Sequence, residues 1–172
     1  MNDLFFTGDT HFRHKNILKY CPTTRPYPSI EEHDEALIER WNSVVSPSDL
    51  VYHLGDVAFA PPEVSEKILQ RLNGRIHLIL GNHDRKLPRG RFVEVSTYAD
   101  ITVNRTHFVL FHFPIESWDR VHHGAIHLHG HTHGAIGSHH GIELRERRMD
   151  VGVDTHPRNE PWALEDILEA VK

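Results

Sequence analysis

The stretch Leu4-Phe5-Phe6-Thr7-Gly8-Asp9-Thr10-His11 places a short apolar run directly before a carboxylate and an imidazole. A short apolar run bounded by glycine is typical of a buried strand. The same order recurs at residues 50–54, which precede Gly55-Asp56, and at residues 75–80, which precede Gly81-Asn82-His83-Asp84. Side chains with metal-binding donors therefore stand at the carboxyl ends of three predicted strands.

Predicted helices alternate with these strands. Ser29 is a predicted N-cap, Glu32 completes its capping box, and the helix that they start runs to about Val44. Shorter helices are predicted over residues 13–20 and, after Pro61-Pro62, over residues 63–72. This β-α-β-α-β order predicts a parallel sheet with right-handed crossovers, in which ligands bind beyond the carboxyl ends of the strands.

The second half of the chain is richer in strands. Strands are predicted over residues 92–95, 98–103, 107–111, 125–129 and 148–153, with a hairpin turn at Asn104-Arg105 and a final helix over 161–171. The whole chain, residues 1–172, is predicted to form one α/β domain, because its length suits one core. In this domain a mixed sheet sandwich has helices outside.

Histidines in the second half repeat the pattern of the first. His112 follows a predicted apolar strand, and His131 and His133 lie between glycines in Gly130-His131-Thr132-His133-Gly134. In extended backbone, side chains two apart leave the same face, so Asp9 and His11 pair in this way, as do His131 and His133. His127 and His129 share that parity; they lie either beneath the site or solvated on the open face of the sheet. His122, His123, His139 and His140 are predicted to be loop residues without a role.

Composition narrows the class of protein. The chain is 38% hydrophobic and 25% charged, as in ordinary globular proteins, and no run approaches the about 18 apolar residues of a membrane span. No leader peptide is visible, and the single cysteine, Cys21, fits a reducing compartment, so a cytoplasmic location is expected. The net charge of −5 disfavours a stable nucleic-acid complex but is compatible with a nucleotide substrate.

The ordered donors resemble the calcineurin-like metallophosphoesterase superfamily, in particular its small bacterial, archaeal and phage members. The family motifs read D-x-H, G-D, G-N-H-[DE], H and G-H-x-H, and the resemblance runs over residues 4–133. It implies a four-layer α/β/β/α sandwich of two mixed sheets. It also implies two divalent metal ions, one held by Asp9, His11, Asp56 and His133, the other by Asp56, Asn82, His112 and His131. Mixed nitrogen and oxygen ligands favour manganese, with iron, zinc or nickel as alternatives.

The resemblance further implies hydrolysis of a phosphoester by a hydroxide that bridges the two metals. In the family pattern His83 is a proton donor or transition-state stabiliser and not a ligand. We expect a phosphodiesterase for small or nucleotide-derived substrates. A phosphomonoesterase is the alternative in the same class, and an inactive binding scaffold, like the retromer subunit that resembles these enzymes, is the alternative from another class. The intact donors and His83 argue against the scaffold.

Two departures from the family pattern bear on the substrate. Many family phosphatases carry G-D-x-x-D-R, whereas Phe59 and Ala60 stand here in place of the second Asp and the Arg, which disfavours protein-phosphatase activity. Substrate-binding residues are predicted at the rim of the site: Arg13, His14, Asn16 and Arg85. A solvated basic helix face is the other interpretation of the residues after D-x-H.

Overall fold

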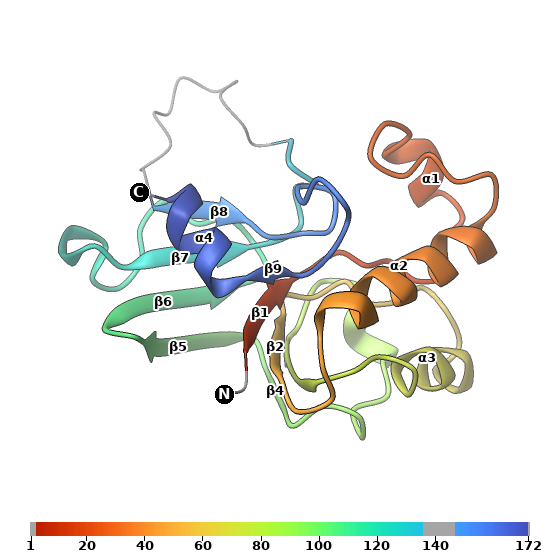
Figure 1. Cartoon of the computed structure of the whole chain (residues 1–172), viewed down its shortest axis with the longest axis horizontal. Coiled ribbons are helices and arrows are strands. Elements are labelled where there is room, and N and C mark those ends of the chain that lie inside the picture. The colour runs from red at the N-terminus through yellow and green to blue at the C-terminus, as the bar shows by residue number, and fades with distance from the viewer. Residues whose placement is uncertain (1–2, 136–146, 172) are drawn as a thin grey trace.

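The computed structural model of the protein describes residues 3–135 and 147–171. Two sheets form its framework (Figure 1). The first has the order β4-β3-β2-β1-β9 and consists of β1 Leu4–Thr7, β2 Leu50–His53, β3 Arg75–Ile79, β4 Glu94–Ser96 and β9 Trp162–Ala163. The second has the order β5-β6-β7-β8 and consists of β5 Tyr98–Val103, β6 Thr106–Phe111, β7 Ile126–His129 and β8 Arg148–Asp150. Both sheets are mixed, as predicted, because β9 and β5 each pair antiparallel with an otherwise parallel set.

The helices lie mainly against the first sheet. They are α1 Ile17–Tyr20, α2 Ile30–Val44, α3 Pro62–Leu69 and α4 Leu164–Ala170, with single 3-10 turns at η1 Asp84–Lys86 and η2 Val121–His123. In Figure 1, α2 and α3 lie to the right of β1, whereas β5 to β8 lie to its left. The predicted cap of α2 is confirmed, since the backbone N–H of Glu32 donates to the Ser29 hydroxyl at 3.2 Å.

The alternation of apolar side chains along the strands explains the layers. Phe5 faces outward and packs with Leu37 and Trp41 of α2, whereas the next residue, Phe6, faces inward and stacks on Phe108 of the second sheet. The inward residues of both sheets form one continuous core that α4 closes at one edge. Among the described residues, a loop with η2 covers the outer face of the second sheet, where Trp118 packs on Val109.

Several segments differ from the predicted boundaries; β8, for example, ends at Asp150 and not at residue 153. The helix predicted over residues 13–20 begins only at Ile17, because Arg13 has a left-handed backbone, with φ of 65°. The final helix begins at Leu164, since Trp162 and Ala163 pair instead with β1 as a short strand. The predicted hairpin is confirmed, with positive φ at both Asn104 and Arg105 between β5 and β6. His139 and His140 lie outside the described residues.

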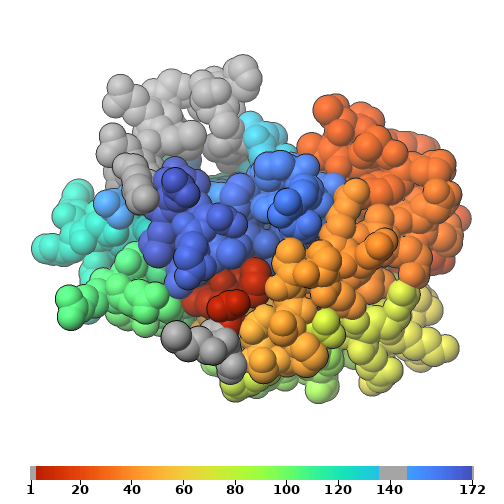
Figure 2. All heavy atoms as spheres, viewed as in Figure 1, coloured from red at the N-terminus to blue at the C-terminus, as the bar shows by residue number. Residues whose placement is uncertain are grey.

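The space-filling view shows how the chain closes on itself. In Figure 2 the first strand emerges as a red patch between the C-terminal segment, in blue, and the orange α2 region. Gly8, just after β1, forms a parallel bridge with Gly152, just after β8, so the two sheets meet at the carboxyl ends of these strands. No described helix is both long and apolar enough to cross a membrane.

Candidate metal centre

The predicted donors meet at the carboxyl ends of five strands, at the edge where the two sheets adjoin. Asp9 and His11 follow β1, Asp56 follows β2, and Asn82 and His83 follow β3. From the second sheet come His112 after β6, and His131 and His133 after β7. Backbone hydrogen bonds from Asp9 N to Gly55 O (2.9 Å) and from His11 N to Asp56 O (3.0 Å) join the first two loops.

The donors of each D-x-H and H-x-H pair converge, but not through the extended backbone that was predicted. Asp9 and His11 are not extended: their φ values are 54° and 47°, and those of His131 and His133 are 70° and 50°. Asp56 is also left-handed, with φ of 57°. Each such conformation costs about 1–2 kcal/mol in a residue other than glycine, and clusters of them are found at functional sites. The tight turns, and not pleated strands, aim these donors at one point.

Glycines allow the loops to approach each other closely. A Cβ at Gly130 would lie 2.5 Å from Oδ2 of Asp9, and a Cβ at Gly81 would overlap Oδ1 of Asp56. The absence of a side chain at Gly130 therefore lets the loop that carries His131 approach Asp9.

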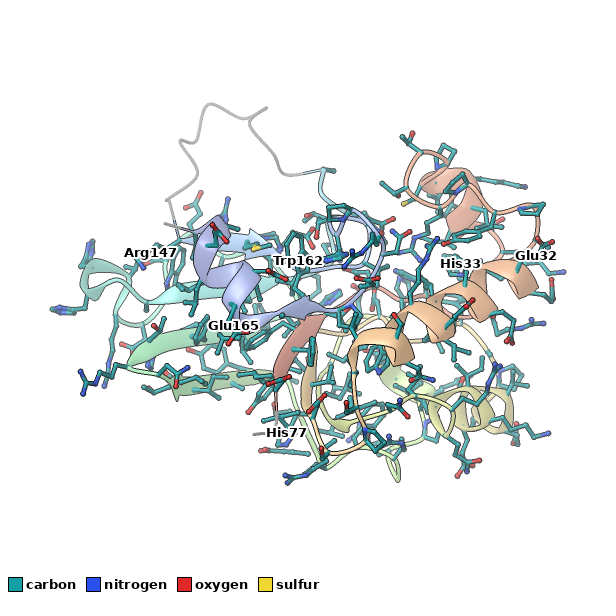
Figure 3. The ribbon with its side chains drawn as sticks, in the orientation of Figure 1. Glu32, His33, His77, Arg147, Trp162 and Glu165 are labelled. Carbon is teal, nitrogen blue, oxygen red and sulfur yellow. The ribbon has the colours of Figure 1, made fainter. Side chains whose placement is uncertain are left out.

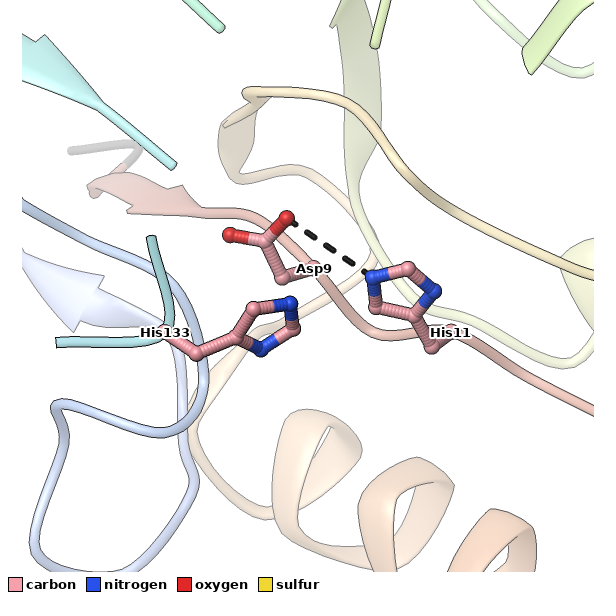
Figure 4. A group of neighbouring side chains, drawn as sticks. All are labelled: Asp9, His11 and His133. Carbon is pink, nitrogen blue, oxygen red and sulfur yellow. Dashed lines mark ion pairs between the residues drawn. The ribbon is translucent and has the colours of Figure 1, made fainter. Parts of the chain in front are cut away.

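The first group of donors consists of Asp9, His11 and His133 (Figure 4). Each can offer one ligand atom, and these atoms lie within 4.8 Å of one another. Oδ1 of Asp9 and both ring nitrogens of His11 are buried and have no hydrogen-bond partner among the described residues. Because an unpaired buried polar atom costs about 1–3 kcal/mol, a cation at this point would satisfy atoms that are otherwise orphaned. The donor set fits a divalent metal.

The second group consists of Asp56, His112 and His131, with Asn82 beside them. Nδ1 of His112 lies 2.6 Å from the carbonyl oxygen of Leu54, and a donated hydrogen bond there leaves Nε2 free as a ligand. That Nε2 atom lies 3.1 Å from Oδ1 of Asn82 and 3.5 Å from Oδ2 of Asp56. This second donor set also fits a divalent metal.

Asp56 stands between the two groups. Its Oδ2 atom lies 3.7 Å from Nε2 of His11, 3.5 Å from Nε2 of His112 and 3.9 Å from Nε2 of His83. Its Oδ1 atom accepts a hydrogen bond from the backbone N–H of His83 at 3.0 Å. A single carboxylate can therefore serve both sets of donors.

Burial and neighbouring charges shift the pKa values of the donors in different directions. Burial raises the pKa of Asp9 to about 7, although nearby His133 opposes the shift, and a bound cation would favour the carboxylate again. Burial, together with Arg25, lowers the pKa of His11 to about 2, so this ring is neutral, the form that binds metal. Burial opposes ionisation of Asp56, but hydrogen bonds from His112 and the His83 backbone lower its pKa to about 2.

Several residues that support the site were not predicted. Asp154 accepts from Nδ1 of His133 at 2.7 Å, and the buried Arg25 donates to it from Nε (2.9 Å) and Nη2 (2.5 Å). Asp84 accepts from the backbone N–H groups of Asp56, Val57 and Gly81 at 2.8–2.9 Å and so ties the second loop to the third. The sequence contains a signal for Asp154, because this residue follows the apolar run of residues 151–153 just as Asp9 follows the run of residues 4–8. Arg25, in a proline-rich loop, had none.

His127 and His129 are buried, so the solvated interpretation is wrong for both. His127 contacts the carbonyl oxygens of Val109 and Phe113 and holds a loop. His129 lies beneath the site, where Nδ1 is 2.8 Å from the carbonyl oxygen of Gly130.

The residues predicted at the rim lie in different surroundings. Arg13 pairs with Glu31 of α2 at 3.0 Å and lines a separate cavity beside α2 and α3. His14 stacks on Phe59 with ring centroids 4.3 Å apart, and Asn16 is exposed at the start of α1. Arg85 lines a pocket together with Asn82 and His83. His33 of α2, labelled in Figure 3, is buried and does not line this pocket; its Nε2 atom lies 3.1 Å from Nη1 of Arg25.

The fold and the site define an α/β sandwich with carboxylate and histidine donors gathered at the ends of its strands. The chain belongs to the calcineurin-like phosphoesterase family, whose model matches residues 4–105. It is 38% identical to an uncharacterized protein of Methanocaldococcus jannaschii over 100% of this chain and 93% of that protein. It is 32% identical to the Gene 66 protein of Mycobacterium phage L5, over 92% of this chain and 89% of that protein.

The fold also matches a solved structure, that of a protein of unknown function from Aquifex aeolicus. The TM-score is 0.77 at 21% identity, over 98% of this chain and 99% of that one. The resemblance to the family and the predicted fold class are therefore confirmed.

Proposed function

We propose that this protein is a metal-dependent phosphodiesterase that acts on small or nucleotide-derived substrates through two divalent cations. The observation that carries the proposal is the position of Asp56, whose Oδ2 atom lies within 3.9 Å of ring nitrogens of His11, His112 and His83. Family membership supports phosphoester chemistry. Asp9, His11, Asp56 and His133 would hold one cation, and Asp56, Asn82, His112 and His131 the other.

When bound, two such cations supply the Lewis acidity that activates water and offsets charge on the phosphate oxygens. Manganese is the proposed metal, because the donors combine oxygen and nitrogen. His83 then has a separate task. Its side chain is 38% exposed and its Nε2 atom faces Asp56, so it can approach a substrate from the solvent side and donate a proton to the leaving oxygen.

The surroundings favour a diester over a monoester. A phosphomonoester carries a second negative charge, which the Arg of the family phosphatases would neutralise by an ion pair. Ala60 occupies that position here, and the neighbouring Phe59 is apolar and 46% exposed. A phosphate esterified on both sides needs less charge compensation and brings a second substituent that can use an apolar surface.

The test compares bis-p-nitrophenyl phosphate with p-nitrophenyl phosphate, using chelator-stripped protein to which Mn²⁺ is restored. We expect turnover of the diester that Asp56→Asn abolishes, which excludes a contaminating enzyme. Replacing His83 with Asn should reduce kcat by about 100-fold or more while the metal content, measured by mass spectrometry, stays the same. A preference for the monoester would favour the phosphatase instead. Absence of turnover with both cations bound would favour an inactive scaffold.

A further inference from the structure

A pocket of about 650 Å³ opens directly beside the candidate metal centre. Asn82 and His83 line both the centre and the pocket. Besides Ser65, Arg85 and Lys86, the rest of its wall is apolar: Ala58, Phe59, Ala60, Pro61, Pro62 and Leu87. Pockets of about 300–1,000 Å³ with apolar walls and a few polar groups are typical of small-molecule sites.

Phe59 is the one aromatic ring in the lining that the structure describes for this pocket, apart from the imidazole of His83. His14 supports it from behind, with ring planes 17° apart and centroids 4.3 Å apart. The ring of His83 lies 4.7 Å from it. A large apolar ring that is 46% exposed and stacked on His14 is a preformed surface for stacking.

Charge around the pocket has one sign. Arg85 and Lys86 line it, and the described lining residues include no carboxylate. An apolar wall with cations at its rim suits a flat, uncharged group that is joined to phosphate. Bases stack favourably on aromatic side chains, largely independent of the identity of the base.

We infer that this pocket receives the leaving nucleoside of a nucleotide diester, with its base stacked on Phe59. The inference rests on the proposed function, because it places the leaving group on the His83 side. In the reaction a P–O bond forms to the oxygen of water and the P–O bond to the nucleoside breaks. Water loses one proton to the solvent, the leaving oxygen gains one from His83, and His83 regains its proton from the solvent. The products are a nucleotide monoester and a nucleoside.

The experiment uses thymidylyl-thymidine and the two methyl diesters in which a methyl group replaces one nucleoside or the other. Product analysis of thymidylyl-thymidine shows which of its two nucleosides is the leaving group. The methyl ester used for comparison is the one in which methyl replaces that nucleoside. Both leaving groups are simple alcohols, so intrinsic reactivity contributes little to the comparison. We expect kcat/KM for thymidylyl-thymidine to exceed that of this methyl ester by about tenfold, and Phe59→Ala to reduce the ratio to near one.

Two controls separate the possible failures. Tyr98→Ala removes another exposed aromatic ring, on β5 and outside the pocket, and should leave the ratio as in the wild type. Binding of the same diesters to metal-loaded His83→Asn, by calorimetry, should show the same tenfold preference in Kd.

Equal kcat/KM values for the two diesters would overturn the inference, and so would a ratio of these values that Phe59→Ala does not alter. Either result would leave the proposed phosphodiesterase activity standing. Absence of turnover with every diester would overturn the proposed function. Equal dissociation constants for the diesters would then reject the nucleoside pocket as well.

Discussion

Nδ1 of His133 lies 2.7 Å from Oδ2 of Asp154, and Arg25 and Thr24 donate hydrogen bonds to the same carboxylate. This hydrogen bond, together with Cys21 and the charge of Asp9, raises the pKa of His133 to about 10 against the opposing effect of burial. It fixes the orientation of the ring, so that Nε2 faces Asp9 and His11, and makes the ring a stronger base. Metal ligands are commonly oriented by such carboxylates.

Asp154→Asn should therefore weaken metal binding at the Asp9, His11 and His133 group by about 10- to 100-fold. The amide keeps the shape of the side chain but loses the charge that favours the His133 orientation. Calorimetric titration of chelator-stripped protein with Mn²⁺ measures the effect. Glu35→Gln, which alters an exposed carboxylate paired with Arg71 elsewhere, is the control and should bind as the wild type does. An unchanged affinity in Asp154→Asn would remove Asp154 from the support of this site.

Arg25→Ala should lower the free energy of unfolding by about 3–5 kcal/mol, because it leaves the Asp154 carboxylate buried without its partner. Arg25 is 1% exposed and also donates to the carbonyl oxygens of Asp9 and Thr10. Urea unfolding in the presence of chelator measures the loss. Arg71→Ala breaks an exposed pair with Glu35 and should cost less than about 1 kcal/mol. Similar costs for the two variants would contradict the buried network.

Adding Mn²⁺ to chelator-stripped protein should raise Tm by about 5–10 °C. A ligand at 100 times its Kd stabilises by about 2.7 kcal/mol, and each kcal/mol shifts Tm by about 2–4 °C in a domain of this size. The orphaned atoms of Asp9 and His11 are the structural reason. Scanning calorimetry would record the shift, and Asp56→Asn should show less of it. A Tm that does not respond to any divalent cation would argue against a metal centre.

Acid should destabilise the metal-free protein partly through His127. Burial lowers the pKa of this ring to about 4, below the unfolded value of 6.5, so protons bind preferentially to the unfolded chain. The stability that the neutral ring contributes is present above about pH 6.5 and is lost as the pH falls toward 4. Between pH 7 and pH 5 the loss from this residue is about 2 kcal/mol.

Urea unfolding at the two pH values, in chelator, tests this expectation. His127→Gln should lose about 2 kcal/mol less than the wild type over that interval, because glutamine does not titrate. His122→Gln, at an exposed position, should follow the wild type. Parallel pH dependences for His127→Gln and the wild type would show that His127 does not carry the effect.

Much of the first sheet could be predicted because β1, β2 and β3 are each a short, largely apolar run that is followed by glycine and a donor. Phe5 and Phe6 illustrate why this signal is strong: neighbouring residues must face opposite cores, so both are apolar. The boundaries at β9 and α1 could not be predicted, since pairing of Trp162 with Phe6 and the left-handed turn at Arg13 depend on distant contacts.

The sequence by itself determined the order of the strands and which donors stand at their carboxyl ends, because local apolar patterns and adjacent residues carry that information. Only the tertiary structure decided how the donors are aimed and supported. Asp56 faces three imidazoles because loops from both sheets converge on it, and Arg25 meets Asp154 across 129 residues of chain. Contacts between residues so far apart are chosen by packing of the whole core, and no local pattern encodes them.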